Sequence, residues 1–141
     1  MKQEEVRNMS QIVYRQMLRA KVHRPTVTRT EVDYEGSLTL DADLMRAAGM
    51  VPYERIDVYD CDNGQRFSTY LIEGVAGSGE VCVNGAAARL ATTGHRIIIA
   101  AYCSIPEEQI GSHKPTIVLV DAKNRIKSTS HKIVAGTVVP G

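Results

Sequence analysis

The chain has 141 residues, enough for one domain with its own hydrophobic core. Its 17 lysine and arginine residues nearly balance 16 aspartate and glutamate residues, so the net charge of +1 gives no global positive field that would attract nucleic acid or an anionic membrane. Aromatic residues make up only 5% of the chain, which leaves little material for stacking nucleic-acid bases. We therefore expect neither nucleic acid nor a membrane as a partner.

The three cysteines, Cys61, Cys82 and Cys103, are widely spaced and have no Cys-x-x-Cys pairing, which argues against a zinc site and a disulfide framework. We interpret them as reduced thiols in the core and expect no metal. The longest apolar run, residues 97–103, is too short to span a bilayer, and the first residues contain no apolar signal segment. These features predict a soluble, cytoplasmic protein.

The first third of the chain divides into a leader and strand-like segments. Residues 1–12 are polar and charged and are predicted to be a leader, followed by a single domain over residues 13–141. Residues 13–22 and 26–32 mix apolar and polar side chains in the manner of strands, and Pro25 is expected to interrupt them.

A short helix is expected next, over residues 42–48, because Asp41 is a suitable N-cap and Gly49 a suitable end. The dipeptide Asn63-Gly64 is the strongest hairpin signal in the chain and lies between two alternating segments. Further strands are predicted over residues 55–60, 65–72, 81–83, 97–102 and 116–120, with a helical turn from Asn84 to Leu90 and a tail that either adds an edge strand or is mobile. Many short strands and glycine-rich turns favour a small closed or partly closed β-barrel.

The stretch Tyr34-Glu35-Gly36-Ser37 is a candidate for self-cleavage. A serine hydroxyl can attack the preceding carbonyl and convert the amide into an ester, and glycine leaves that carbonyl least shielded. Elimination across Cα–Cβ of Ser37 would break the ester, and hydrolysis of the dehydroalanine would leave a pyruvoyl group, an electron sink that condenses with amines. The alternative interpretation of the same residues is an ordinary turn.

Four motifs resemble, in order and approximate spacing, the aspartate 1-decarboxylase family over residues 13–121. They are Lys21-Val22-His23-Arg24, Tyr34-Glu35-Gly36-Ser37, Asn63-Gly64-Gln65-Arg66-Phe67-Ser68-Thr69-Tyr70 and Val83-Asn84-Gly85-Ala86-Ala87-Ala88. The resemblance implies a mainly β fold, a double-psi β-barrel with short helices, assembled as a homotetramer with active sites between subunits. It also implies pyruvoyl-dependent decarboxylation of L-aspartate to β-alanine and carbon dioxide, for pantothenate and coenzyme A biosynthesis.

The resemblance assigns roles to individual residues. Cleavage between Gly36 and Ser37 would turn Ser37 into a covalently bound pyruvoyl group. Thr69 would hold the oxyanion formed during cleavage, and Tyr70 would return a proton to the α-carbon of the substrate. The implied substrate-binding residues are Arg66, Lys21, His23, Asn84, Gly85, Ala86 and Ala87.

The chemistry suits these residue types on its own terms. An enzyme acting on L-aspartate must bind one carboxylate with a cation and leave the other able to depart as carbon dioxide. The bidentate fork of Arg66 suits the retained β-carboxylate, although the sequence leaves open which carboxylate it binds. Tyrosine is a suitable proton donor because its pKa near 10 keeps it protonated at neutral pH.

Each assignment also has a purely structural interpretation. Arg66 could be a solvated surface residue, Tyr70 a core aromatic, and His23 a structural hydrogen-bonder. On a regular strand Thr69 faces away from Arg66 and Tyr70, so the three roles need a bulge, a strand end or pockets met from both sides at a subunit boundary. His95, His113 and His131 have no metal-ligand spacing and are interpreted as surface or structural residues.

Two other functions compete with the leading one. The first is an unprocessed small β-barrel binding module, with nucleic acid among its ligands, in which Gly36-Ser37 is only a turn. The second is the same chemistry on another small amino acid. Under the leading hypothesis, cleavage either proceeds unaided or requires a maturation-promoting partner protein, and the sequence is compatible with both.

Overall fold

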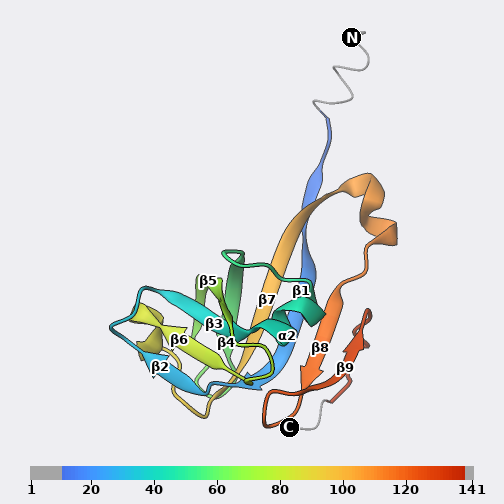
Figure 1. Ribbon diagram of the computed structural model, residues 1–141. Helices are drawn as coiled ribbons and strands as arrows, with labels where there is room; N and C mark the ends of the chain where they lie inside the picture. The colour runs from blue at the N-terminus through green and yellow to red at the C-terminus, as the bar shows by residue number, and fades with distance from the viewer. Residues whose placement is uncertain (1–10, 139–141) are drawn as a thin grey trace.

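The computed structural model describes residues 11–138, which form a mainly β structure with short helices (Figure 1). Hydrogen-bonded neighbours follow the order β2-β6-β3-β5-β4-β7-β1-β8-β9. The strands are β1 (Tyr14–Thr26), β2 (Arg29–Glu31), β3 (Ser37–Asp41), β4 (Arg55–Asp60), β5 (Arg66–Gly74), β6 (Val81–Asn84), β7 (Arg96–Pro106), β8 (Thr116–Val120) and β9 (Ile126–Ser130). The prediction of a β-barrel with short helices is confirmed, and its double-psi connectivity stays a prediction. Residues 1–10 of the predicted leader lie outside the described part of the chain.

Apolar side chains from most of the strands meet in a single core. Burying one such side chain contributes about 1.5–3 kcal/mol to stability. The largest fully buried side chains are those of Leu38, Leu40, Leu44, Ile56, Leu71, Ile97, Ile99, Val22, Val27, Val58, Val81 and Val83. This core fixes the strands that carry the candidate site residues. Within residues 11–138, the helices are too short or too polar to cross a membrane.

Helix α2 (Ala42–Ala48) begins and ends where the sequence predicts. The carboxylate of Asp41 accepts a hydrogen bond from the Asp43 amide at 2.8 Å, and Gly49 ends the helix in the left-handed conformation at φ 69°. Asp41 also accepts hydrogen bonds from the amides of Gly77 (3.0 Å) and Gly79 (2.8 Å). One buried carboxylate therefore joins the helix to the loop between β5 and β6.

The predicted hairpin at Asn63-Gly64 is confirmed, and it joins β4 to β5. Asp60 fixes the turn by accepting hydrogen bonds from the Asp62 amide at 2.8 Å and the Asn63 amide at 3.1 Å. His95 Nδ1 lies 2.7 Å from the same carboxylate, a structural contact that fits the expectation for this histidine. The pairing of β5 with β4 is regular from Arg66 to Tyr70, so a bulge does not explain how Thr69 could share a site with its neighbours.

The predicted break at Pro25 is wrong, because β1 runs through this proline. The register between β1 and β7 shifts between His23 and Thr26, and Arg24 takes a positive φ of 64°. Proline has no amide proton to donate, and the irregularity accommodates it without ending the strand.

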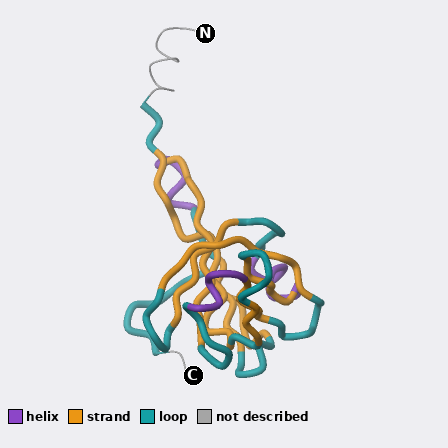
Figure 2. Tube along the Cα trace, turned by 90° about the vertical axis from the view of Figure 1, so that its left-hand side faces the viewer, coloured by secondary structure: helices purple, strands orange, loops and turns teal. Residues whose placement is uncertain are grey.

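The β1–β7 pair is longer than predicted and projects from the body of the molecule as a two-stranded ribbon (Figures 1 and 2). The short 3₁₀ helix η2 (Glu107–Ser112) lies at its far end. At the other end of the chain, β9 pairs antiparallel with β8, so the tail adds the edge strand that was one of its two expected states.

Buried thiols are fewer than predicted. Only Cys82 lies in the interior, whereas Cys61 is exposed and Cys103 is partly exposed. All three are free thiols. Cys61 lies in the exposed turn directly after β4, where the chain leaves the core.

Candidate active site

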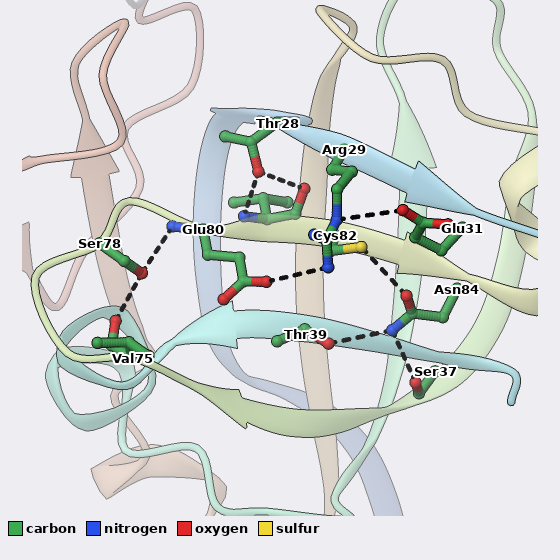
Figure 3. A network of polar contacts seen from close by, with 11 residues as sticks. Thr28, Arg29, Glu31, Ser37, Thr39, Val75, Ser78, Glu80, Cys82 and Asn84 are labelled. Atoms are coloured by element: carbon green, nitrogen blue, oxygen red, sulfur yellow. Dashed lines mark hydrogen bonds and ion pairs between the residues drawn. The ribbon is translucent and has the colours of Figure 1, made fainter. Parts of the chain in front are cut away.

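Ser37 is the first residue of β3, and its side chain is buried, with only 4% of the residue exposed. Its hydroxyl donates a hydrogen bond to the carbonyl of Glu35 at 3.1 Å. It also accepts a hydrogen bond from Asn84 Nδ2 at 3.0 Å, which Figure 3 shows. Among residues 11–138, no histidine, lysine or carboxylate hydrogen-bonds to the Ser37 hydroxyl. The nucleophile predicted from sequence is therefore held in place, but without a general base.

Asn84 is the centre of this polar cluster. It lies directly opposite Ser37 in the antiparallel pair of β3 and β6. Its Nδ2 also donates to Thr39 Oγ1 at 3.0 Å, and its Oδ1 accepts from Cys82 Sγ at 3.1 Å. The cluster occupies one face of the two strands, while Leu38 and Val83 face the core from the other. The resemblance assigns Asn84 to the substrate-binding residues, which stays a prediction, and in the structure Asn84 hydrogen-bonds to Ser37.

Gly85 packs directly against the residue before the predicted cleavage point. A Cβ atom on Gly85 would lie 2.6 Å from Gly36 Cα and 2.8 Å from Gly36 N, and Gly85 has a positive φ of 75°. Both the contact and the conformation require glycine. Gly36 has open space where its own Cβ would be, so packing does not explain why this position is glycine.

Tyr70 is the predicted catalytic residue that lies nearest to Ser37 in the sheet. Strands β3 and β5 are parallel with Leu38 opposite Leu71, so continuing the register by one residue places Tyr70 level with Ser37 and on the same face. Thr69 points to the other face, where its strand partner is the buried Ile56. Within residues 11–138 Thr69 makes no side-chain hydrogen bond to the cleavage segment.

Arg66 lies away from Ser37 of the same chain. It is four residues before Tyr70 on β5, about 13 Å along the strand. Its guanidinium stacks 4.2 Å from the centre of the Tyr59 ring, and no carboxylate in the described part of the chain forms an ion pair with it. Arg66 therefore keeps its hydrogen-bond donors free for a ligand.

The surface around Arg66 is hollowed into a pocket of about 350 Å³. The other residues that line it are Arg55, Asp57, Tyr59, Phe67 and Ser68. The Tyr59 hydroxyl lies 2.7 Å from that of Tyr102, and this hydrogen bond, followed by burial, raises the pKa of Tyr102 to about 12. Tyr59 is therefore fixed at both its ring face and its hydroxyl, which makes it a rigid support for the arginine.

Lys21 and His23 lie on β1, and three strands separate β1 from the strand of Ser37. They line a separate cavity of about 390 Å³ together with Arg24, residues of β8 and the tail. Burial, and then the charges of Lys21 and Arg24, lower the pKa of His23 to about 4, and burial also lowers the pKa of Lys21. His23 Nδ1 is buried and has no hydrogen-bond partner within residues 11–138.

One chain thus assembles only part of the predicted site. Ser37, Asn84, Gly85 and the aligned Tyr70 come together, whereas Arg66 and the Lys21–His23 pair lie on other surfaces. Ala86 and Ala87 follow directly in the 3₁₀ helix η1 (Gly85–Arg89). Sequence reasoning did not single out Thr39 and Cys82 as parts of the site. Each lies two residues from Asn84 or Ser37 on its strand and so on the same face. This spacing is informative only once the register of β3 and β6 is known.

Comparison with known proteins identifies the family of this chain. The family model for aspartate decarboxylase matches residues 13–127. An aspartate 1-decarboxylase from Ralstonia nicotianae is 54% identical over 113 residues, 80% of this chain and 94% of the relative. Aspartate 1-decarboxylases from Dehalococcoides mccartyi (strain 195) and Legionella pneumophila (strain Lens) are 47% and 48% identical, covering 84% and 82% of this chain and 96% and 87% of the relatives. The chain belongs to the aspartate decarboxylase family.

Proposed function

We propose that this chain is an aspartate 1-decarboxylase that converts L-aspartate to β-alanine and carbon dioxide in the cytoplasm, for pantothenate and coenzyme A biosynthesis. Before acting, it cleaves itself between Gly36 and Ser37 and generates its own pyruvoyl group. The observation that carries the proposal is the buried Ser37 hydroxyl, held by Asn84 at the start of β3 and directly after a glycine. The names of the relatives support the substrate.

The cleavage needs no reactant other than this protein and water. Ser37 Oγ attacks the carbonyl carbon of Gly36, the C–N bond breaks, and the chain continues through an ester with a free amine on Ser37. Loss of the Ser37 α-proton to solvent and cleavage of the bond between Cβ and the ester oxygen then leave a carboxylate on Gly36 and dehydroalanine at position 37. Water converts the dehydroalanine into the pyruvoyl group and ammonia.

The rate of this cleavage is expected to be low. A positioned general base contributes typically 10²–10⁴-fold, and the Ser37 hydroxyl has none, since its proton is donated to the Glu35 carbonyl. The unprocessed protein should therefore be isolable and should mature slowly. A maturation-promoting protein would act on this step.

The residues around Ser37 suit the group that it would become. The pyruvoyl group supplies the electron sink for the carbanion left when carbon dioxide departs. Asn84 holds position 37 from the neighbouring strand. Tyr70, level with Ser37, would deliver the proton to the α-carbon of the substrate, and Arg66 would bind one substrate carboxylate.

The positions of Arg66, Lys21 and His23 support active sites that lie between subunits. Arg66 is exposed and about 13 Å along its strand from the level of Ser37, too far to reach a substrate held there in the same chain. A neighbouring subunit in a homotetramer would bring these three side chains to Ser37. Thr69, which faces away from Ser37 along the regular strand, would support the oxyanion only across the boundary between subunits.

The test follows the intact mass of the denatured protein during incubation. The wild-type chain should divide into a fragment that ends at Gly36 and one that begins with the pyruvoyl group, and should then release carbon dioxide from L-aspartate. Ser37→Ala should stay whole and inactive, while Ser128→Ala, which alters an exposed serine of β9, should be processed normally. Carbon dioxide release by the Ser37→Ala variant would refute the mechanism. The wild-type chain is incubated both alone and with an extract of the cells that express it. A chain that stays whole under both conditions would refute self-processing.

A further inference from the structure

We propose that Cys82 is a positioning residue for self-cleavage, because its thiol orients the side-chain amide of Asn84 so that an N–H group points at Ser37 Oγ. The inference rests on the self-cleavage proposed above. Cys82 is only 1% exposed and lies on β6 opposite Thr39 of β3. Its sulfur lies 3.1 Å from Asn84 Oδ1, a short separation for a contact that involves sulfur.

The orientation of the Asn84 amide has to be set by a neighbour. A carboxamide carries a donor at one end and an acceptor at the other. The Thr39 hydroxyl does not decide between the two ends, since a hydroxyl can donate or accept, and the Ser37 hydroxyl selects the NH₂ end only while its own proton is donated to the Glu35 carbonyl. The Cys82 thiol selects the same end independently, because an S–H group that donates to Oδ1 turns the NH₂ end toward both hydroxyls.

Arg29 also lies against Cys82. Its guanidinium lies beside the sulfur of Cys82 (Figure 3), and the contact with Cys82 raises the pKa of Arg29. The hydrogen bonds then run in one direction, from Cys82 through Asn84 to Ser37, and from the Ser37 hydroxyl to the Glu35 carbonyl.

The orientation matters because the same oxygen becomes charged during cleavage. Ser37 Oγ first becomes the ester oxygen. When the bond between this oxygen and Cβ breaks, it becomes one of the carboxylate oxygens of Gly36. A preplaced N–H donor stabilises the negative charge that develops there, whereas a carbonyl oxygen in the same position would repel it. The thiol of Cys82 therefore acts on the reaction through Asn84.

Three variants test the proposal by following the cleavage rate with intact mass. Cys82→Ala removes the thiol, and we expect cleavage to become about tenfold slower. This factor corresponds to the loss of the stabilisation that one hydrogen bond provides. Cys82→Ser restores a donor and should recover most of the rate. Cys103→Ala removes a partly buried thiol elsewhere and should cleave like the wild type. Unaltered cleavage of Cys82→Ala, or a serine variant as slow as the alanine variant, would overturn the proposal.

A second measurement does not depend on cleavage. In the Ser37→Ala background, which cannot be processed, NMR reports the solvent exchange of the Asn84 side-chain amide. Adding Cys82→Ala should accelerate this exchange severalfold, and adding Cys103→Ala should not. Unchanged exchange would refute the positioning role. If the wild-type chain never cleaves but the exchange does accelerate, the positioning holds and the proposed self-processing fails.

Discussion

Gly85 leaves no room for a side chain against Gly36: a Cβ atom at position 85 would lie 2.6 Å from Gly36 Cα. The contact is between backbone atoms, so no rotamer change can relieve it. Gly85 therefore sets the position of the carbonyl that Ser37 must attack, in addition to any contact with the substrate.

We expect Gly85→Ala to slow self-cleavage by about a hundredfold, the effect of displacing a reacting group by around 1 Å. The left-handed conformation adds a folding cost of about 1–2 kcal/mol, which has to be separated from the steric effect. Gly64→Ala is the matched control, since Gly64 has nearly the same φ of 76° and open space around it. Intact mass should show normal cleavage in the control. Equal cleavage rates in the two variants would contradict the steric role of Gly85.

Tyr70→Phe should separate processing from decarboxylation. The tyrosine hydroxyl has no assigned task in cleavage, so fragments should form at nearly the normal rate. Loss of the proton donor should lower the decarboxylation rate by about 10²–10⁴-fold. Carbon dioxide release, measured on fully cleaved protein, checks the result. Tyr53→Phe, at an exposed tyrosine, is the control and should retain activity. Loss of cleavage in Tyr70→Phe would show that the tyrosine acts earlier.

The separation of Arg66 from Ser37 within one chain predicts complementation between two inactive variants. Ser37→Ala lacks the nucleophile and Arg66→Ala lacks the carboxylate-binding cation. If each site takes these residues from different subunits, coexpression should yield hybrid oligomers in which some sites contain both, and activity should return to a measurable fraction of the wild-type value. Mixtures of Ser37→Ala with Tyr70→Phe serve as a comparison, because those two residues lie level on adjacent strands of the same chain.

The outcome of this experiment bears directly on assembly. Absence of recovery in purified hybrid oligomers that contain both variants would place Arg66 and Ser37 of one site in the same subunit. The proposed arrangement between subunits would then be wrong.

Local sequence signals predicted the elements whose cause is local. Asp41 and Gly49 define α2 from within a few residues, and Asn63-Gly64 defines the hairpin by its own backbone preference. The prediction at Pro25 was wrong because it used only local sequence. The register shift between β1 and β7 that accommodates the proline depends on a strand distant in the sequence. The extension of β7 beyond residue 102 was missed because its partner, the first half of β1, is distant in sequence.

The candidate site shows the same division. Gly36-Ser37 could be found from chemistry and resemblance, since the reacting atoms are adjacent in the chain. The contact of Ser37 with Asn84, 47 residues away, depends on the register of β3 and β6. All four residues of β6 are buried, so the strand has no alternation of buried and exposed residues. The sequence therefore did not indicate that Cys82 lies on the face that reaches Ser37. The residues that surround the cleavage point could therefore be identified only once the pairing of the strands was known.

His23 predicts how stability depends on pH in the unprocessed protein. Its pKa is about 4 in the folded chain against an ordinary value of 6.5, because burial and the charges of Lys21 and Arg24 disfavour the protonated ring. Between these two values the unfolded chain binds a proton that the folded chain does not. The free energy of unfolding should therefore be unaffected by this group above about pH 6.5 and should fall as the pH is lowered from there to about 4.

Urea denaturation of the uncleavable Ser37→Ala variant, measured from pH 7.5 to pH 4 in about half-unit steps, checks this. Replacing His23 with glutamine removes the titrating group but keeps a polar side chain, so the decline in stability between about pH 6.5 and 4 should become shallower. His131→Gln, at an exposed histidine of the tail, controls for loss of a histidine and should retain the full decline. Identical slopes for His23→Gln and the parent would mean that His23 is protonated as readily in the folded chain as in the unfolded one, which would contradict the effect of burial and of the charges of Lys21 and Arg24.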